Sequence, residues 1–391
     1  MAAISYGSAY SGSPTTIYNT LIADFSAALS SRYYLDYFKV QSASSSELTV
    51  TNLASNFSYT FKGSFSYSGG LPLGSSLVTG ISVKNAASVP LVSVTGLPYT
   101  ISDIANATLA GFTSTFNSLP WDVSGSAGND SFQVGSASTS FDGGAGIDTV
   151  AFSGNLANYT LTKSGSTYTV RAKTGTDGTD TLTNVECLKF TDVSVNLQIK
   201  GIAAAAPLAD VQRISELYVA FFNRTPDADG LAYWIGQKMA GQSINQISES
   251  FYTVGASSTF SALTGFSTSM SNTDFLNVFY KNVLGRPEGA DAGGLAYWNG
   301  KLADGSSTRS SLANDILESA HTFKGNPTYG FVADLLDNKI AVANTIAVEW
   351  GLTYNTDAYA RGVAIAAAIT PTDTMVALAL VGVSAADLNI T

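Results

Sequence analysis

Cysteine and histidine are almost absent from this sequence, which holds one of each among 391 residues. The single cysteine, Cys187, excludes a disulfide within the chain, and its strand-like surroundings indicate a small packed residue. The single histidine, His321, excludes the paired-histidine zinc helix of metalloproteases. The Gly-x-Ser-x-Gly elbow and the Walker and dinucleotide glycine loops are also missing. We therefore expect no enzyme, although a hydrolase whose catalytic groups meet only in the fold stays an alternative.

Charge is scarce as well. Charged residues make up 12% of the chain, which is about half of the ~25% usual for soluble proteins. The net charge of −10 argues against nucleic acid and anionic membrane surfaces as partners, because both require clustered positive charge. No apolar run approaches the ~18 residues that a membrane span needs. Residues 1–8 lack the basic and apolar stretches of a cleavable secretory signal, so we expect none.

Two glycine-rich segments stand out, Gly125-Ser-Ala-Gly-Asn-Asp130-Ser-Phe132 and Gly143-Gly-Ala-Gly-Ile-Asp148-Thr-Val150. Both match the nonapeptide G-G-x-G-x-D-x-U-x, the first with Ser126 in place of the second glycine, and they start 18 residues apart. In a parallel β-roll that spacing stacks two turns on the same edge, where Asp130 and Asp148 would supply carboxylates to Ca²⁺. The candidate ligands and turn residues are Gly125, Gly128, Asn129, Asp130, Asp142, Gly143, Gly146 and Asp148.

The residues between and after these segments fit the same scheme. Residues 134–141 are poor in glycine, so the half-coil on the other edge is degenerate, and we expect one or two Ca²⁺ sites. Residues 159–163 and 168–171 alternate like a hairpin. Asp177 and Asp180 form a further candidate ligand pair. The alternative is that all these segments are ordinary Gly, Asn and Asp turns of a β protein.

Residues 121–197, with these repeats and the run from Asp177 to Asp192, resemble the calcium-binding region of haemolysin-type (RTX, repeats-in-toxin) proteins and the segment that closes it. The resemblance implies a short parallel β-roll, a requirement for Ca²⁺ and export by the type I secretion machinery. The last residues, 385–391, are compatible with an uncleaved C-terminal export signal.

The region before the repeats, residues 1–120, reads as mostly β. Tyr59, Phe61, Phe65 and Tyr67 alternate with polar residues, and strand-like runs follow at 77–83 and 89–97. Helices are expected at 15–29 and 101–116. The sparse charge of this region leaves two interpretations open, a self-association surface or a plain extension of the roll.

The region after the repeats reads as helical. An alanine-rich linker is expected at 203–207, followed by helices up to residue 381. The segments Arg224-Thr-Pro-Asp227 and Gly230-Leu-Ala-Tyr-Trp234 return as Arg286-Pro-Glu288 and Gly294-Leu-Ala-Tyr-Trp298, so Gly-Leu-Ala-Tyr-Trp recurs after 64 residues. The repeat resembles a bacterial helical domain of unknown function that accompanies calcium repeats in secreted surface proteins. In each copy we expect the arginine and the acidic residue to form an ion pair that fixes the loop, and the Tyr-Trp pair to pack in the core.

These observations predict a multidomain α+β chain. Its parts are a β-rich domain (1–120), an RTX-like β-roll with a closing hairpin (121–200), a duplicated helical domain (201–328) and a helical C-terminal segment (329–391). Residues 201–391 also resemble the helical anchoring half of Gram-negative S-layer proteins, which implies lipopolysaccharide or another surface polysaccharide as partner. We therefore expect a secreted, Ca²⁺-dependent surface protein that self-assembles into sheets or filaments. A calcium-dependent adhesin or carbohydrate-binding module is the alternative.

Overall fold

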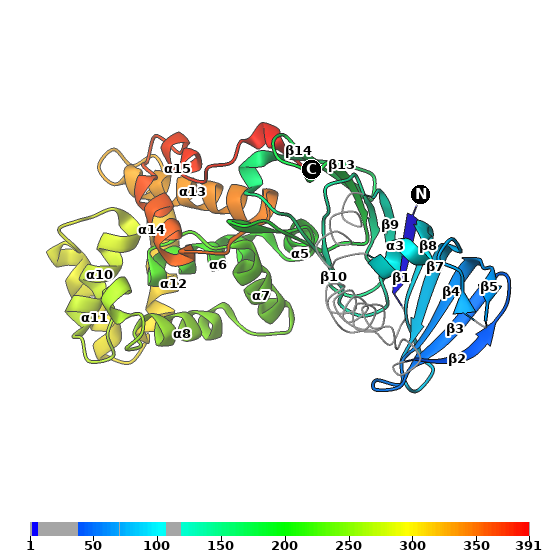
Figure 1. Cartoon of the computed structure of the whole chain (residues 1–391). Coiled ribbons are helices and arrows are strands. Elements are labelled where there is room, and N and C mark those ends of the chain that lie inside the picture. The colour runs from blue at the N-terminus through cyan, green and yellow to red at the C-terminus, as the bar shows by residue number, and fades with distance from the viewer. Residues whose placement is uncertain (1, 7–37, 70, 107–118, 391) are drawn as a thin grey trace. The chain divides into compact units, whose positions relative to one another are not determined.

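The chain divides into two compact units, Met1–Thr191 with Ala385–Thr391, and Asp192–Ser384. The computed structural model describes residues 2–6, 38–69, 71–106 and 119–390. Strands dominate the first unit and helices the second (Figure 1). This confirms the coarse expectation of a β-rich half followed by a helical half.

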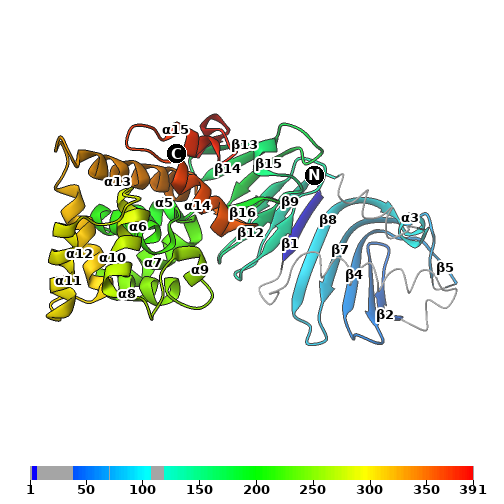
Figure 2. The ribbon, with the colours of Figure 1, turned by 90° about the vertical axis from the view of Figure 1, so that its left-hand side faces the viewer.

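The N-terminal strands form an antiparallel part of one sheet, and Figure 2 shows them side by side. The strands are β1 Ala2–Tyr6, β2 Phe38–Ala43, β3 Glu47–Asn52, β4 Ser58–Ser64, β7 Leu77–Lys84 and β8 Pro90–Thr100. Among the described residues their order is β1-β8-β7-β4-β3-β2. The expected alternation is present in β4, where Tyr59 and Phe61 are buried and Lys62 is exposed. Period-2 patterning therefore sets the buried face of this sheet.

The alternation weakens after β4, where the structure departs from the sequence pattern. The pairing of β4 with β7 shifts register between Lys62 and Gly63. Phe65 is buried, but Tyr67 is only partly buried and its hydroxyl donates to the Ser44 carbonyl oxygen. Tyr67 lies in a separate short pair, β5 Tyr67–Ser68 with β6 Leu71–Pro72. A bulge ends the regular face before Tyr67 is reached.

Only part of the two N-terminal helix predictions can be compared with the structure. The helix expected at 15–29 lies outside the described residues. Of the helix expected at 101–116, the described part is helical as α3, Ile101–Asn106, and residues 107–118 lie outside the described part. The Asp103 carboxylate accepts hydrogen bonds from the Thr100 amide and hydroxyl at the start of this helix.

Four short strands follow, β9 Trp121–Ser124, β10 Ser131–Gln133, β11 Ser140–Asp142 and β12 Thr149–Ala151. They form two parallel ladders, and each ladder pairs residues that lie 18 positions apart. Phe141 lies opposite Val123 in one ladder, and Val150 lies opposite Phe132 in the other. The ladders belong to different sheets, so the chain changes sheet every nine residues. These four side chains are buried, and the Phe132 and Phe141 ring centroids are 5.6 Å apart.

A hairpin follows, and a third layer after it continues both ladders. The hairpin strands are β13 Tyr159–Ser164 and β14 Thr167–Ala172, and the strands of the third layer are β15 Thr179–Thr183 and β16 Cys187–Lys189. β13 and β14 form the predicted antiparallel hairpin. β15 pairs in parallel with β11, and β16 pairs in parallel with β12. Leu182 and Leu188 are buried on these strands. A strand from the end of the chain, β19 Leu388–Asn389, pairs with β13.

The second unit is built around the helices that the 3.6-residue periodicity predicted. Its helices are α5 Ile199–Ala205, α6 Leu208–Phe222, α7 Ala228–Met239, α8 Ile244–Gly255, α9 Ser261–Thr264, α10 Asn272–Leu284, α11 Ala292–Ala303, α12 Arg309–His321, α13 Gly330–Ala343, α14 Ala358–Ala368 and α15 Met375–Ala379. Two strands, β17 Val193–Asn196 and β18 Leu352–Tyr354, pair antiparallel. Phe221, Phe275 and Phe279 lie at the centre of the core. None of the described helices has the length and hydrophobicity that a membrane crossing needs.

Three details of this unit differ from the sequence prediction. The expected linker at 203–207 is helical up to Ala205, because alanine is the strongest helix former and Pro207 breaks the helix only afterwards. The repeated apolar segments predict that helices begin at Leu231 and Leu295, but α7 and α11 begin three residues earlier, because an aspartate caps each of them. The apolar periodicity of residues 331–350 predicts one long helix, but the helix changes after Ala343 into a π-helix, Asn344–Glu349.

Candidate metal site

The two glycine-rich turns, residues 125–130 and 143–148, lie against each other in successive layers. A Cβ atom on Gly125 would lie 2.0 Å from the carbonyl oxygen of Gly143. One on Gly143 would lie 2.0 Å from the carbonyl oxygen of Asn184 in the third layer. Gly144 and Gly146 have φ angles of +92° and +128°, which favour glycine. Glycine is therefore required here both for close approach and for backbone conformation.

A ladder of hydrogen bonds joins the acids of the three layers. The Asp130 amide donates to Asp148 Oδ1 at 2.7 Å. The Asp148 amide donates in turn to Glu186 Oε2 at 2.8 Å. The structure thus brings Asp130 and Asp148 together, as the 18-residue spacing predicted. It also adds Glu186, which the sequence reasoning missed.

Asp130 and Asp148 are both buried, and each keeps one oxygen without a hydrogen bond. Asp130 Oδ2 accepts from the Ser126 amide at 2.6 Å and from its hydroxyl at 3.0 Å, while Asp130 Oδ1 has no hydrogen-bond partner. Asp148 Oδ2 also has none. Burial raises the pKa of Asp148 to about 6, and the nearby carboxylates of Glu186, Asp130 and Asp142 contribute to the rise. A buried carboxylate without full compensation is costly, so this edge has an unmet need for positive charge.

The other candidate residues of these turns act through the backbone or lie at the surface. Asn129 Oδ1 accepts from the Ile147 amide at 2.9 Å and so ties the first turn to the second. The carbonyl oxygen of Gly128 lies 2.7 Å from where a Cβ on Gly146 would be. Asp142 is exposed, and its Oδ1 accepts from the Gly144 amide and the Asn184 side-chain amide. These residues hold the stacked turns together.

Asp177 and Asp180 do not behave as a pair. The Asp177 carboxylate accepts from the Ser153 amide at 2.9 Å, from the Ser153 hydroxyl at 2.6 Å and from the Tyr159 hydroxyl at 2.5 Å. Both of its oxygens are therefore engaged by the protein. Asp180 Oδ1 accepts from the Thr139 amide at 2.8 Å, and its buried Oδ2 has no hydrogen-bond partner. Burial raises the pKa of Asp180 to about 7, with the charge of Asp177 adding to the rise.

Asp180 lies on the second edge of the double ladder, opposite Thr139. Ser140 pairs with Thr181, so Thr139 and Asp180 precede paired residues as Asp130 and Asp148 do on the first edge. Thr139 brings no carboxylate. The first edge therefore carries two stacked aspartates and the second edge carries one.

The donor atoms at the first edge are oxygens, from carboxylates and from backbone carbonyls of the stacked turns. Ca²⁺ prefers such ligands, whereas soft metals prefer thiolate or imidazole. Asp130 Oδ1 and Asp148 Oδ2 are the atoms free to bind a cation. Across the described residues, no group of three His, Cys, Asp or Glu side chains converges in the manner of a metal centre.

His321 is the last residue of α12 and packs against acids. Its Nε2 contacts Glu216 Oε1, and its Nδ1 lies 3.5 Å from Asp337 Oδ1. The hydrogen bond with Glu216 raises the pKa of His321 above its usual value. Arg213 lies 3.4 Å from the same Glu216 carboxylate. The histidine is part of an ion-pair cluster that joins α6, α12 and α13.

The duplicated segment forms the same structure twice in the helical unit. Arg224 pairs with Asp227 at 2.9 Å, and Asp227 caps α7 by accepting from the Gly230 amide. In the second copy Arg286 pairs with Asp291 at 2.9 Å, and Asp291 accepts from Gly294 at the start of α11. The expected pinning of both loops is confirmed. The acid of the second copy is Asp291, however, and the proposed replacement by glutamate at 288 was wrong.

The Tyr-Trp pairs are only half buried. Trp298 is buried and donates to the Tyr280 hydroxyl at 2.8 Å. Tyr233 and Tyr297 are each 58% exposed, against the expectation that both members of each pair are core. On a helix, adjacent residues point about 100° apart, so one ring packs inward while its neighbour faces solvent.

Comparison with known families adds one match, to a domain of unknown function (DUF4214) over residues 253–325. The match includes the second copy of the repeat, with Arg286, Asp291 and Trp298, whereas the first copy lies outside it. No curated protein matches the chain.

Proposed function

We propose that this chain is a secreted structural protein of a Gram-negative cell surface, an S-layer-like or extracellular-matrix subunit. It folds and assembles when it binds Ca²⁺ outside the cell. The observation that carries this proposal is the stacking of Asp130 on Asp148, both buried and both with a carboxylate oxygen free of hydrogen bonds. A bound divalent cation would supply the positive charge that neither carboxylate receives from the protein.

The double ladder fits a short RTX-like β-roll in this proposal. An 18-residue register in two sheets is what a roll of nonapeptides requires, since each coil passes through both sheets. Asp130 and Asp148 would hold the ion, with backbone carbonyls of the glycine turns. Ser126 positions the Asp130 carboxylate through hydrogen bonds, and Glu186 holds the backbone of Asp148 by accepting from its amide. Asp180 is a candidate for a weaker site on the second edge, because only one carboxylate is present there.

Calcium concentration would then act as the folding signal. Without a cation, the buried acids repel one another and disfavour the stacked turns. At extracellular concentrations of ~10⁻³ M, even a weak site is occupied and stabilises the folded chain by mass action. The chain would remain open for type I export in the cytosol and close outside. The helical unit would bind surface polysaccharide or neighbouring subunits.

Assembly tests this function directly. The purified chain, refolded in chelator and then given millimolar Ca²⁺, should form ordered sheets or filaments visible by negative-stain electron microscopy. Chelator should dissolve them, and Mg²⁺ at the same concentration should not replace Ca²⁺, because Mg²⁺ demands a smaller octahedral site. Particles that remain monomeric with Ca²⁺ at every concentration tested would argue for the adhesin alternative and against a lattice subunit.

A further inference from the structure

A hollow of about 630 Å³ opens beside the second copy of the repeat, where α11, α12 and the start of α13 meet. Its size falls within the ~300–1,000 Å³ of ordinary small-molecule sites. Residues of the repeat itself line it, among them Arg286, Asp291, Tyr297 and Trp298. The DUF4214 match covers these four residues.

Aromatic rings form an accessible part of the lining. Tyr297 is 58% exposed, and Phe323 and Tyr329 are 36% and 37% exposed. The Phe323 and Tyr329 ring centroids are 5.6 Å apart. Lys301 Nζ lies 5.4 Å from the Tyr297 ring centroid, and Arg286 Cζ lies 5.6 Å from the Tyr329 ring centroid. Each of these rings therefore has a cation over one face, and the C–H face of a sugar ring would pack against the other.

Four of the five charged groups in the lining are paired within the protein. Arg286 pairs with Asp291 at 2.9 Å, and Lys301 lies 3.6 Å from Asp315. A fifth charged residue, Glu318, is exposed at the same hollow. The two cations and three acids leave a net charge of −1 in the lining, so an anionic ligand would find no surplus positive charge. The same groups offer many hydrogen-bond donors and acceptors to hydroxyl groups.

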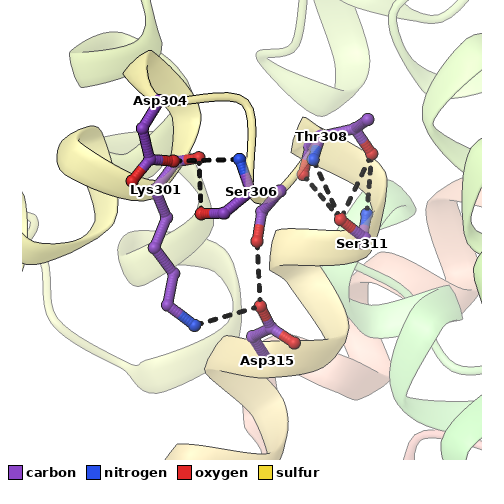
Figure 3. A network of polar contacts seen from close by, with 7 residues as sticks. Lys301, Asp304, Ser306, Thr308, Ser311 and Asp315 are labelled. Carbon is purple, nitrogen blue, oxygen red and sulfur yellow. Dashed lines mark hydrogen bonds and ion pairs between the residues drawn. The ribbon is translucent and has the colours of Figure 1, made fainter.

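The wall that carries Lys301 is held by a local network (Figure 3). The Ser306 hydroxyl donates to the Lys301 carbonyl oxygen at 3.2 Å, and the Ser306 amide donates to Asp304 at 2.9 Å. The Ser307 hydroxyl donates to the Asp315 carboxylate at 3.2 Å. The turn between α11 and α12 is thus fixed before any ligand arrives, which lowers the entropic cost of binding.

The first copy of the repeat provides an internal comparison. Its Arg–Asp pair is more enclosed, because the Asp227 side chain is 16% exposed whereas Asp291 is 48% exposed. Gly362 of α14 approaches so closely that a Cβ there would lie 3.1 Å from Arg224 Cβ. The chain itself therefore covers the first loop, while the second stays open to solvent.

We propose that the hollow at the second copy binds a neutral saccharide, with Tyr297 and Tyr329 as stacking rings and Asp291, Lys301 and Glu318 as hydrogen-bonding groups. This assignment rests on the proposed surface role of the helical unit and names the site where a glycan is held. It does not depend on Ca²⁺, since every residue of the hollow lies in the unit Asp192–Ser384.

Binding by the full chain is measured with a panel of neutral hexose and N-acetylhexosamine oligosaccharides and a matched panel of uronic-acid oligosaccharides, using saturation-transfer NMR and calorimetry. At least one neutral oligosaccharide should bind, and Tyr297→Ala and Tyr329→Ala should each weaken it about tenfold. Tyr233→Ala is the matched control, because Tyr233 is the corresponding tyrosine of the first copy with the same exposure, and it should bind like the wild type.

The Asp130→Asn, Asp148→Asn double variant separates this site from the calcium proposal, because it should lose calcium dependence and keep saccharide binding. Absence of binding by every neutral oligosaccharide, a preference for the acidic panel, or equal losses in Tyr233→Ala and Tyr297→Ala would each overturn the assignment. Circular dichroism of each variant shows whether it is folded, and Tyr297→Phe, which keeps the ring, should retain most of the affinity.

Discussion

The carboxyl group of Asp148 lies in a setting that a buried acid ordinarily avoids. It is fully buried, one of its oxygens has no hydrogen bond, and three other acids raise its pKa further. Asp180 is in a similar position on the other edge. Such acids either take up a proton or bind a cation, and the choice depends on pH and on calcium.

This gives a pH dependence with a definite sign. Asp148 and Asp180 have folded-state pKa values of about 6 and about 7, against about 3.9 for an unfolded aspartate. Between pH 4 and pH 7 the folded state therefore holds more protons than the unfolded state. The free energy of unfolding of the calcium-free chain should fall as pH rises through this window, then level off. Thermal unfolding in chelator at several pH values measures it.

His321 adds a contribution of the same sign, because its pKa is raised by Glu216 and its stabilisation is lost as pH rises through that value. The informative quantity is therefore the difference between the wild type and the Asp148→Asn, Asp180→Asn variant, which should show a flatter profile between pH 4 and pH 7. Equal slopes in the two proteins would mean that these carboxyls are not the buried acids described above.

The sequence pointed to Asp130 and Asp148 because glycine turns and an acid recur after 18 residues. The sequence did not predict Glu186 as part of the site, because no glycine-rich turn lies directly before it. The inserted hairpin also places Glu186 38 residues after Asp148, and not 18. One signal was available. Leu188 follows Glu186 by two positions, as Val150 follows Asp148, and all four residues lie in paired layers.

At the scale of elements, helix capping decides where the repeat helices begin. Asp227 and Asp291 each stand three residues before the glycine whose amide they accept, and each also pairs with an arginine. Two residues inserted before Asp291 hid this equivalence and made Glu288 look like the counterpart of Asp227. Sequence periodicity located these helices but did not locate their first turns.

Two substitutions distinguish Asp291 from Glu288. Asp291→Ala removes both the cap of α11 and the partner of Arg286, so we expect a loss of about 1 to 2 kcal/mol in the free energy of unfolding. Glu288→Ala should change it by less than about 0.5 kcal/mol, as for an ordinary surface substitution. Urea denaturation of the two variants measures both values. A larger loss at Glu288 would restore the assignment based on the sequence alone.

At the scale of the whole molecule, local patterns predicted the change from strands to helices and the hairpin of β13 and β14. Local patterns did not predict which distant segments pair with each other. The strand β19 pairs with β13 through two residue pairs, one of them Leu388 with Leu161. A strand this short has no periodicity from which its partner strand could be predicted. The hollow beside Tyr297 is equally non-local, since it combines residues of four helices, α10 to α13, and the segments between them.

The most direct test of the calcium site is the rise in melting temperature that Ca²⁺ produces in three proteins. These are the wild type, the Asp130→Asn, Asp148→Asn double variant, and Asp122→Asn, which changes an exposed acid on the neighbouring strand β9. At about 100 times the Kd, Ca²⁺ should raise the melting temperature of the wild type and of Asp122→Asn by roughly 5 to 10 °C. The double variant should show no rise. A full rise in the double variant would contradict the assignment of Ca²⁺ to these stacked turns.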